Sequence, residues 1–400
     1  RNKKVDKDHP AAYKKEYPWL KEVDSLALAN EQLHLEQAYR KFFKESKIGF
    51  PKFKSKHGSR KSYTTNVVNG NIRIAEGKLR LPKVGTVKIR LHRELPAGWT
   101  LKSVTVSMDP SGKYYASLLF AFESCENQAG TVREEKVLGI DYAMHGMAVL
   151  STGEKCENPG YYRQAQKRLT REQRKLSHCR KGSRNYQKQK RKVARCHEKV
   201  RNQRKDYHHK LSFRLAEEYD AVAVEDLDLK AMSRGLNFGK SVMDNGYGKF
   251  LHMLSYKLEQ RGKVLVKIDR FYPSSKKCSK CGKVKETLAL SERTYHCSCG
   301  NHMDRDVNAA INIREEENDY YAHNSAEKDA RIRAINKKEP PDGGDSLLNL
   351  AHKVIEQEAP TSSRQGKWWE HVTIFGIVYL GPGAGDKLWV DHRDPVRIIS

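Results

Sequence analysis

The spacing of apolar residues predicts a helix near the start of the chain. Within residues 24–44, Leu28, Leu35, Tyr39 and Phe42 follow one another in steps of seven, four and three, which places them on one face of a helix. We expect this face to belong to an ordinary hydrophobic core.

From residue 72 to residue 108, apolar and polar side chains alternate in short segments instead. Turn formers separate the segments, as at residues 109–112, which read Asp-Pro-Ser-Gly. A period of two is typical of half-buried strands, so the pattern predicts a small antiparallel sheet or barrel. The alternating apolar positions are Ile72, Ile74, Leu79, Leu81, Val87, Ile89, Leu91, Val104, Val106 and Met108.

After residue 137, buried strands alternate with helical stretches. VLGID and GMAVLS predict a hairpin, AVAVED predicts another buried strand and KVLVKID a further one. Helix-type stretches lie between these strands, so we expect an α/β domain here.

The helical stretch between residues 163 and 210 is strongly basic, with 19 Lys+Arg and 3 Asp+Glu. A break at residues 181–183 predicts two long helices joined by a turn, and Leu169 and Leu176 belong to a thin apolar seam on the first. A merely solvated helix would balance its charges in i,i+4 pairs, so this cluster favours binding to a phosphate backbone. The candidate nucleic-acid-binding residues are Lys167, Arg168, Arg171, Arg174, Lys175, Lys188, Arg191, Lys192, Arg201, Arg204 and Lys205.

The net charge indicates the same class of partner. The chain carries a formal charge of +27 over 400 residues, while its 38% apolar and 31% charged residues are ordinary for a soluble globular protein. Nucleic acid is the commonest partner for such an excess of cations, and an acidic membrane surface is the lesser alternative. No apolar run reaches the roughly 18 residues that span a bilayer, and no secretory signal opens the chain, so we expect a cytoplasmic protein.

Residues 315–400 differ from the rest, since they carry 11 Lys+Arg and 15 Asp+Glu. This segment opens with three glutamates and passes a Pro-Pro-x-Gly-Gly hinge at residues 340–344. An apolar run of strand length follows at residues 372–380. We interpret the segment as an acidic appendage of unknown role.

Four cysteines form a candidate metal site within residues 271–303. One Cys-x-x-Cys pair and one shorter Cys-x-Cys pair are each followed by a glycine. Thiolates at these separations can bind one tetrahedral zinc ion, which favours a zinc ribbon over a redox pair or free thiols, and His296 or His302 could replace one ligand. The predicted ligands are Cys278, Cys281, Cys297 and Cys299. The scattered cysteines, which we interpret as small apolar residues or surface thiols, are Cys125, Cys156, Cys179 and Cys196.

Three acidic residues are candidates for catalytic metal binding. Asp141 closes the strand VLGID, Glu225 closes AVAVE, and Asp306 begins a helix-like stretch after the cysteines. An Asp after a buried strand is usually a turn former or a helix cap, but two neighbouring strands would bring Asp141 and Glu225 to one edge of a sheet. Two magnesium ions held there could activate a water and clamp a scissile phosphate. The nearby acids that we expect to face away are Asp226, Asp228 and Asp304.

Seven segments of the chain resemble the TnpB family, transposon-encoded relatives of the type V CRISPR effectors. They occur in the family's order and lie within residues 12–314. Members of the family usually begin with a β-strand and a helix that this chain lacks. The segments are GFPKFKSK, LGIDYAMHGMAVLS, YYRQAQKRLTREQRKLS, VARCHEKVRNQRKDYHHKLS, VAVEDLDLK, FYPSSKKCSKCG and CGNHMDRDVNAAINI.

The resemblance implies a RuvC-like ribonuclease H fold with a helical insertion and a zinc ribbon, preceded by a helical part and a wedge-type β-barrel. The catalytic acids of the family match Asp141, Glu225 and Asp306, which would hold two Mg²⁺, while the cysteines would hold one structural Zn²⁺. The implied parts are a helical recognition part at 1–50, a wedge-type barrel at 51–130, a nuclease core at 131–270 with a basic insertion at 161–218, a zinc ribbon at 271–303, a last catalytic segment at 304–314 and the acidic extension at 315–400.

The resemblance therefore implies a magnesium-dependent endodeoxyribonuclease. Its expected partners are a guide RNA from the transposon end and a double-stranded DNA target, bound by a monomer. In such a system base pairing supplies specificity, while the protein contacts the backbone and a short flanking motif. Two other functions stay open from the sequence: a DNA-binding protein that does not cut, such as a repressor, and a transposase that joins strands. The complete acidic triad favours the nuclease over the binding protein.

Overall fold

The computed structural model describes residues 10, 12–52, 61–91, 94–95, 98–121, 132–144, 146–235, 239–289, 291–323 and 372–380. The chain divides into two compact units: residues 1–125 together with 339–400, and residues 126–338. The predicted hinge at 340–344 lies outside the described residues. Among the helices of the described part, none is long and apolar enough to cross a membrane.

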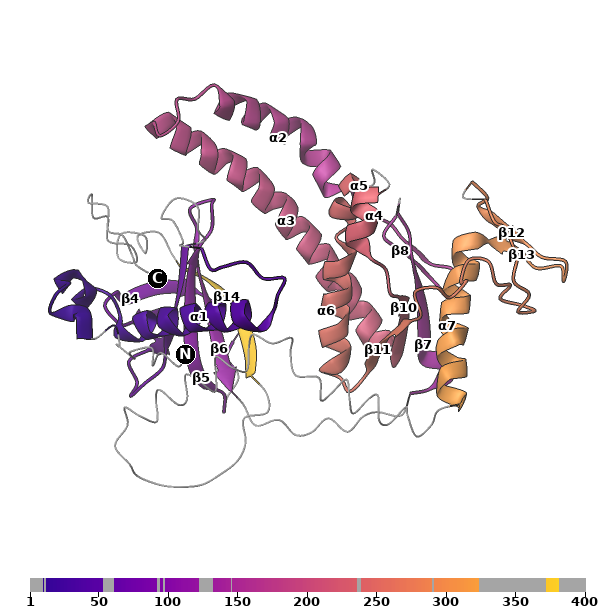
Figure 1. Ribbon diagram of the computed structural model, residues 1–400, viewed down its shortest axis with the longest axis horizontal. Helices are drawn as coiled ribbons and strands as arrows, with labels where there is room; N and C mark the ends of the chain where they lie inside the picture. Colours follow the sequence, from indigo (N-terminus) through magenta and orange to yellow (C-terminus); the bar gives the residue numbers. More distant parts are fainter. Residues whose placement is uncertain are drawn as a thin grey trace. The chain divides into compact units, whose positions relative to one another are not determined.

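The first unit contains a seven-stranded antiparallel sheet with the order β1-β5-β6-β14-β4-β3-β2. Strand β14 comes from the acidic C-terminal segment, yet it lies between β6 and β4 (Figure 1). It pairs with β6 from Val372, opposite Ala121, to Leu380, opposite Tyr114. The predicted strand in this segment is thus part of the sheet of the first unit. The strands are β1 (Lys61–Asn66), β2 (Arg73–Ala75), β3 (Lys78–Leu81), β4 (Gly85–Arg90), β5 (Thr100–Met108), β6 (Tyr114–Ala121) and β14 (Val372–Leu380).

On one face of this sheet, side chains from strands that are not neighbours pack together in one core. Leu79 of β3, Val104 and Val106 of β5 and Leu118 of β6 are fully buried in one cluster, although β14 and β4 separate β3 from β6 in the sheet. The sheet must therefore curl around a common core. Among the described residues β1 and β2 are the two edges and are not paired with each other. The predicted antiparallel sheet is confirmed, and closure into a barrel is not seen in the pairing.

Helix α1 (Ser25–Lys44) packs against β1, and the carboxylate of Asp24 caps its first turn. Its buried residues are Ala27, Asn30 and Leu33, and the Asn30 amide donates a hydrogen bond of 2.9 Å to the backbone of β1. The four apolar residues that the spacing singled out are only half-buried, because the buried face of the helix is the neighbouring row of residues. Two 3-10 turns come before it, η1 (Ala12–Lys14) and η2 (Pro18–Lys21).

The second unit contains a five-stranded sheet with the order β11-β10-β7-β8-β9. Strands β7, β8 and β9 form an antiparallel meander, whereas β10 runs parallel to both β7 and β11. The predicted hairpin and the α/β class of this part are confirmed. The strands are β7 (Val137–Tyr142), β8 (Ala148–Leu150), β9 (Lys155–Cys156), β10 (Ala221–Glu225) and β11 (Val264–Ile268).

Helices cover both faces of this sheet (Figure 1). Val222 and Val224 of β10 pack with residues of α3 and α6, whereas Ala223 packs with Ile313 of α7. Successive residues of a strand point to opposite faces, so α7 lies across the sheet from α3 and α6. The helices are α2 (Tyr161–Ser177), α3 (Arg184–Glu218), α4 (Leu229–Gly235), α5 (Gly239–Asn245), α6 (Tyr247–Glu259) and α7 (Arg305–His323). The short elements are η3 (Glu134–Lys136) and the two-stranded sheet of β12 (Thr294–His296) and β13 (His302–Asp304).

Helix α7 crosses β7 at Gly139 with almost no space between the two backbones. A Cβ atom at residue 139 would overlap the carbonyl oxygen of Ala310 and would lie 2.7 Å from the amide nitrogen of Arg314. Only glycine fits at such a crossing. The crossing fixes the distance between β7, which carries Asp141, and α7, which carries Asp306 in its first turn.

Candidate active site and metal centre

Asp141 and Glu225 lie at the same edge of the five-stranded sheet. Ile140 of β7 is opposite Val224 of β10, and the two strands are parallel, so the next residue on each strand is one of the two acids. Asp306 approaches them from the first turn of α7, which packs against β7. The structure thus brings together the three acids that the sequence singled out, from positions up to 165 residues apart (141 to 306).

The charges of these acids act on one another. The pKa of Asp141 is raised well above its usual value, first by burial and then by the negative charges of Glu225 and Asp306. The backbone amide of Tyr142 and the charge of Arg305 oppose this rise. Such mutual repulsion is what a bound divalent cation would relieve.

Two arginines lie beside Asp306. The guanidinium of Arg305 donates to the Asp306 carboxylate at 3.2 Å and 3.3 Å, and Arg293 lies 3.9 Å from its other oxygen. The Asp306 side chain is about a quarter exposed, with an exposed fraction of 26%. The cluster of acids is therefore partly compensated by protein cations.

The three neighbouring acids, which we expect to face away from the site, have other partners. Asp304 accepts hydrogen bonds from the amides of Asp306 and Val307, so it caps α7, and it pairs with Lys155 at 2.6 Å. Asp228 accepts from two amides of the first turn of α4 in the same way. The side chain of Asp226 pairs with those of Lys267 and Arg270.

Sequence reasoning missed two residues of this site. The hydroxyl of Ser274 donates a hydrogen bond to the Glu225 carboxylate. The buried phenol of Tyr247 has a raised pKa, first because of burial and then because of the charges of Asp141 and Glu225. Ser274 belongs to the FYPSSKKCSKCG segment, but neither residue carries a local pattern that would link it to the acids.

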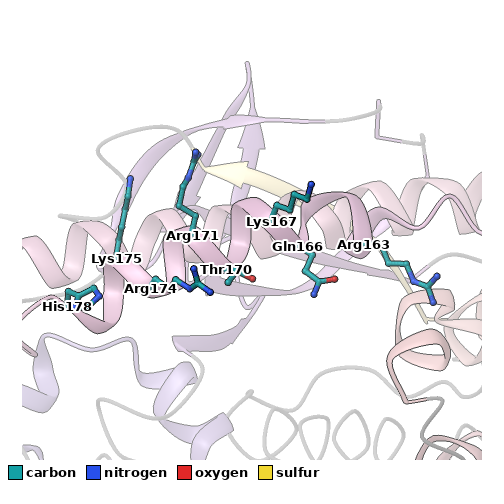
Figure 2. Close-up of a pocket in the computed structure, with 8 residues that line it drawn as sticks. All are labelled: Arg163, Gln166, Lys167, Thr170, Arg171, Arg174, Lys175 and His178. Atoms are coloured by element: carbon teal, nitrogen blue, oxygen red, sulfur yellow. The ribbon is translucent and has the colours of Figure 1, made fainter.

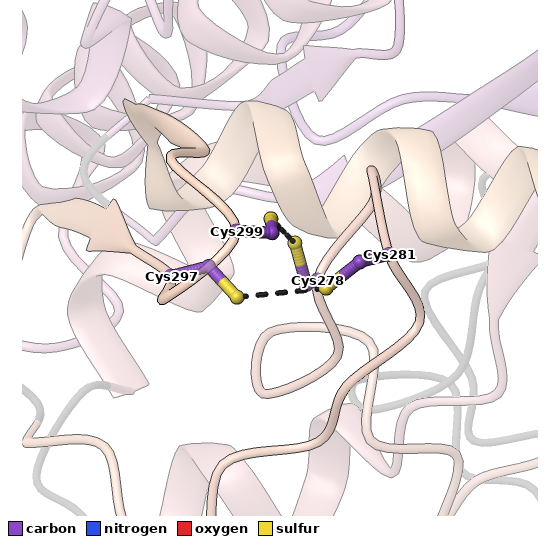
Figure 3. A group of neighbouring side chains, drawn as sticks. All are labelled: Cys278, Cys281, Cys297 and Cys299. Carbon is purple, nitrogen blue, oxygen red and sulfur yellow. Dashed lines mark hydrogen bonds between the residues drawn. The ribbon is translucent and has the colours of Figure 1, made fainter.

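The four predicted thiol ligands converge in the ribbon (Figure 3). The sulfurs of Cys278 and Cys299 are 3.7 Å apart, and those of Cys281 and Cys297 are 3.6 Å apart. Sulfurs bound at about 2.3 Å to one tetrahedral zinc ion would lie about 3.8 Å apart, whereas a disulfide would need about 2.0 Å. The donor set therefore fits a single zinc ion.

In the described part of the chain, this is the one group of three or more His, Cys, Asp or Glu side chains whose ligand atoms all lie within 4.8 Å of one another. The three carboxylates are spread more widely. His296 and His302, the alternative ligands, belong to paired strands, and their rings contact each other at a tilt of 41° with centroids 4.4 Å apart. The shorter Cys-x-Cys pair therefore brings both of its thiols to the site without help from a histidine.

The backbone of the ribbon is arranged for a thiolate at Cys278. Burial of this thiol opposes ionisation, but the amide groups of Cys281 and Lys280 point at its sulfur and lower its pKa to about 6. Of the scattered cysteines, Cys156 is buried and has its pKa raised by burial to about 11, which suits an inert apolar residue. Cys179 and Cys196 are partly exposed, and Cys125 lies outside the described residues.

The two basic helices predicted from the sequence are α2 and α3, which pack side by side and are inserted between β9 and β10. The Ser183 hydroxyl caps α3. Between the helices, the Gln189 amide donates to the backbone oxygen of Glu172 at 3.0 Å, and Leu169 is buried. Because few residues are buried between α2 and α3, most Lys and Arg side chains of the two helices are exposed.

Ten of the eleven candidate nucleic-acid-binding residues are exposed. Figure 2 shows side chains of α2 and of the residue that follows it, His178, which line a surface pocket and are mostly basic. The exception is Arg204, whose guanidinium donates to the backbone oxygens of Met243 and Asp244 and so ties α5 to α3. The pocket residues are Arg163, Gln166, Lys167, Thr170, Arg171, Arg174, Lys175 and His178.

The sequence is similar to known proteins over much of its length. Residues 120–235 match the family described as "Probable transposase", and residues 247–313 match the family described as "Cas12f1-like, TNB domain". The "Putative RNA-guided DNA endonuclease" of Streptomyces pristinaespiralis is 39% identical over 302 residues, which cover 74% of this chain and 73% of that protein. The Escherichia coli K12 protein "Putative RNA-guided DNA endonuclease InsQ" is 32% identical over 320 residues, covering 74% and 76%.

A solved structure of a Cas12f1–sgRNA–target DNA complex aligns with a TM-score of 0.47 and 16% identity, over 72% of this chain and 71% of that chain. The sequence relatives carry the assignment, because identities of 39% and 32% extend over about three quarters of both chains. They confirm the resemblance that the motifs indicated: the chain belongs to the TnpB family.

Proposed function

We propose that the chain is an RNA-guided DNA endonuclease that cleaves phosphodiester bonds at the edge of the five-stranded sheet. The observation that carries this proposal is the convergence of Asp141, Glu225 and Asp306 there. Relatives over three quarters of the chain are described as RNA-guided DNA endonucleases, which supports the same activity. An antiparallel meander followed by two parallel strands supports a RuvC-like ribonuclease H fold for this unit.

The donor set suits magnesium. Carboxylate oxygens are the ligands that Mg²⁺ prefers in proteins. Burial and, after it, the charges of Glu225 and Asp306 raise the pKa of Asp141, and a divalent cation would relieve the repulsion between these charges. Asp141, Glu225 and Asp306 would hold two Mg²⁺. When bound, these ions would make a water molecule a nucleophile at neutral pH and stabilise the charge on the leaving oxygen.

The residues around the acids have separate tasks. Arg293 and Arg305 balance the charge of Asp306 and would be available to pair with a phosphate group bound beside it. Asp304 holds the first turn of α7 in place through its cap and its ion pair with Lys155. In the ribbon, four thiolates would bind one structural Zn²⁺, which stabilises the fold next to Asp306.

The basic hairpin of α2 and α3 would bind nucleic acid through phosphates rather than through bases. Its exposed cations lie on successive turns of α2, a spacing suited to a phosphate backbone. The partners would be a guide RNA from the transposon end and a double-stranded DNA target, bound by a monomer. Base pairing with the guide would then supply specificity, and the protein would contribute backbone contacts and the chemistry.

Two variants of the purified protein, loaded with its RNA, test these assignments. Glu225→Gln keeps the shape of the side chain and removes the charge that holds a metal, so cleavage should fall by several orders of magnitude while nucleic-acid binding survives. Replacing Arg168, Arg171, Arg174 and Lys175 with glutamine should do the reverse. Binding should weaken for all sequences, and the slope of log affinity against log salt should fall by about one unit per lost contact.

The RNA content of the purified protein is the first control, because neither a plain transposase nor a non-specific DNA-binding protein needs a discrete RNA. Protein that carries no RNA and cuts no guide-matched DNA would contradict the proposal. Glu225→Gln protein that cuts at the wild-type rate would contradict the assignment of the site.

A further inference from the structure

Ser274 lies in the loop that connects β11 to the first cysteine of the ribbon. Its side chain is buried, with 5% of the residue exposed, and its hydroxyl donates a hydrogen bond to Oε1 of Glu225. A hydrogen bond to one carboxylate oxygen restricts rotation of the carboxylate and leaves the other oxygen for a metal. Ser274 is therefore placed to set the orientation of Glu225.

Two asparagines of α7 hold the loop that presents Ser274. The Asn312 amide donates to the backbone oxygens of Ser274 and Lys277, both at 2.7 Å. The Asn308 amide also donates to the Lys277 oxygen at 2.7 Å, and its own oxygen accepts from the amide of Ser279 at 3.0 Å. Both asparagines are buried, and they lie one helical turn apart.

The same helix begins with Asp306 in its first turn. Helix α7 thus carries a predicted metal ligand, Asp306, and also the two asparagines that bind the Ser274 loop. That loop leads directly to Cys278. Buried, hydrogen-bonded amides of this kind give a fixed geometry, because each lost bond would leave a polar group unpaired in the interior.

We propose that Ser274 is a positioning residue for Glu225, and that Asn308 and Asn312 fix its loop so that α7 aligns the carboxylate site and the ribbon together. This proposal rests on the metal-binding role of Glu225 in the proposed function. Hydrogen-bond partners of metal-ligating carboxylates tune affinity without touching the metal. The expected role of Ser274 is therefore in metal affinity, not in the chemical step itself.

The test uses the full chain without nucleic acid and Mn²⁺ as a paramagnetic probe of the carboxylate site, with free Mn²⁺ measured by electron paramagnetic resonance. Glu225→Gln defines the signal that belongs to this site. Ser274→Ala should weaken that Mn²⁺ binding about tenfold, the usual effect of losing such a partner, while Ser274→Thr keeps the hydroxyl and should restore it. The matched control is Ser275→Ala, because within the described residues the neighbouring Ser275 makes no side-chain hydrogen bond and should behave as wild type.

Zinc content, measured on the same samples, separates positioning from general structure. It should be equal in all variants. Ser274→Ala protein with wild-type Mn²⁺ affinity would overturn the proposal and leave the proposed function untouched. Loss of zinc in Ser274→Ala would also overturn it, because the hydroxyl would then be supporting the ribbon. Wild-type protein without any Glu225-dependent Mn²⁺ binding would contradict the metal site of the proposed function, and the role of Ser274 with it.

Discussion

The ribbon and the sheet edge are both candidate metal centres, but they differ in how closely the fold brings their ligand atoms together. The four thiols come from residues 278–299, and their sulfurs lie at the separations of a tetrahedral zinc site. The three carboxylates come from residues 141–306 and are spread more widely, and the pKa of Asp141 is raised first by burial and then by the charges of Glu225 and Asp306. The fold thus already brings the four thiols to the spacing that a zinc ion would need, whereas the carboxylates lie farther apart, and a cation would offset their charges.

Removing the ribbon ligands should give the largest effect on stability. Structural zinc contributes its binding energy to folding, with apparent values of about 10–16 kcal/mol in small zinc domains. The double variant of Cys278→Ser and Cys281→Ser should lose the zinc, about one ion per chain, and residues 271–303 should become accessible to proteases. Metal analysis and limited proteolysis measure both. Wild-type protein that contains no zinc when prepared without chelators would contradict the prediction that the four thiols bind a structural zinc ion.

Gly139→Ala should disturb the sheet edge and spare the ribbon thiols. The new methyl group would collide with the backbone of α7, and such overpacking costs about 1–3 kcal/mol. Because α7 carries Asp306, cleavage should fall more than the loss of stability alone explains. Gly248→Ala in α6 is the matched control: its new Cβ would meet only the end of the Leu229 side chain, and alanine favours a helix. Equal activity of the two variants would contradict a close crossing at Gly139.

Asp141→Asn should change stability least of the three, and it should stabilise the protein, whereas the other two variants destabilise it. The folded protein binds a proton at Asp141 more tightly than the unfolded chain does, so the contribution of this group is greatest at low pH and is lost as the pH rises through its raised pKa. Metal-free Asp141→Asn should therefore melt about 2–4 °C higher at neutral pH, the shift expected for roughly 1 kcal/mol in a domain of this size. The difference should close as the pH falls, and added Mg²⁺ should stabilise only the wild type.

Thermal melts of both proteins across pH, with and without Mg²⁺, measure this effect. A variant that melts below the wild type at neutral pH would show that the charge on Asp141 does not destabilise the folded protein.

The two centres also differ in how far the sequence predicted them. Short spacing within one ribbon determines which thiols meet, so Cys278, Cys281, Cys297 and Cys299 could be grouped from their separations alone. The meeting of Asp141, Glu225 and Asp306 depends on strand order and on the path of α7, which local patterns do not contain. Their places at the ends of predicted strands and at the start of a helix made them candidates, the resemblance to a family supported the grouping, and their roles remain a prediction.

Contacts between distant segments account for what the sequence did not predict. The bond from Ser274 to Glu225 joins residues 49 positions apart, and the C-terminal strand β14 lies between β6 and β4, far from its own neighbours in sequence. The charge of Arg204 makes it a candidate for phosphate binding, but its guanidinium donates hydrogen bonds to backbone oxygens of α5. Hydrophobic period predicted the strands of both units, but it could not predict their order.

Cleavage of guide-matched DNA by Asp306→Asn and Asp304→Asn tests the central claim most directly, since the two acids are two residues apart. The charge of Asp306 acts on Asp141, and if both hold the metal, Asp306→Asn should lower the rate by several orders of magnitude. Asp304 caps α7, and asparagine is as good a cap as aspartate, so Asp304→Asn should lose only its ion pair with Lys155 and cut at close to the wild-type rate. The reverse result, with Asp304→Asn inactive and Asp306→Asn active, would contradict the site described here.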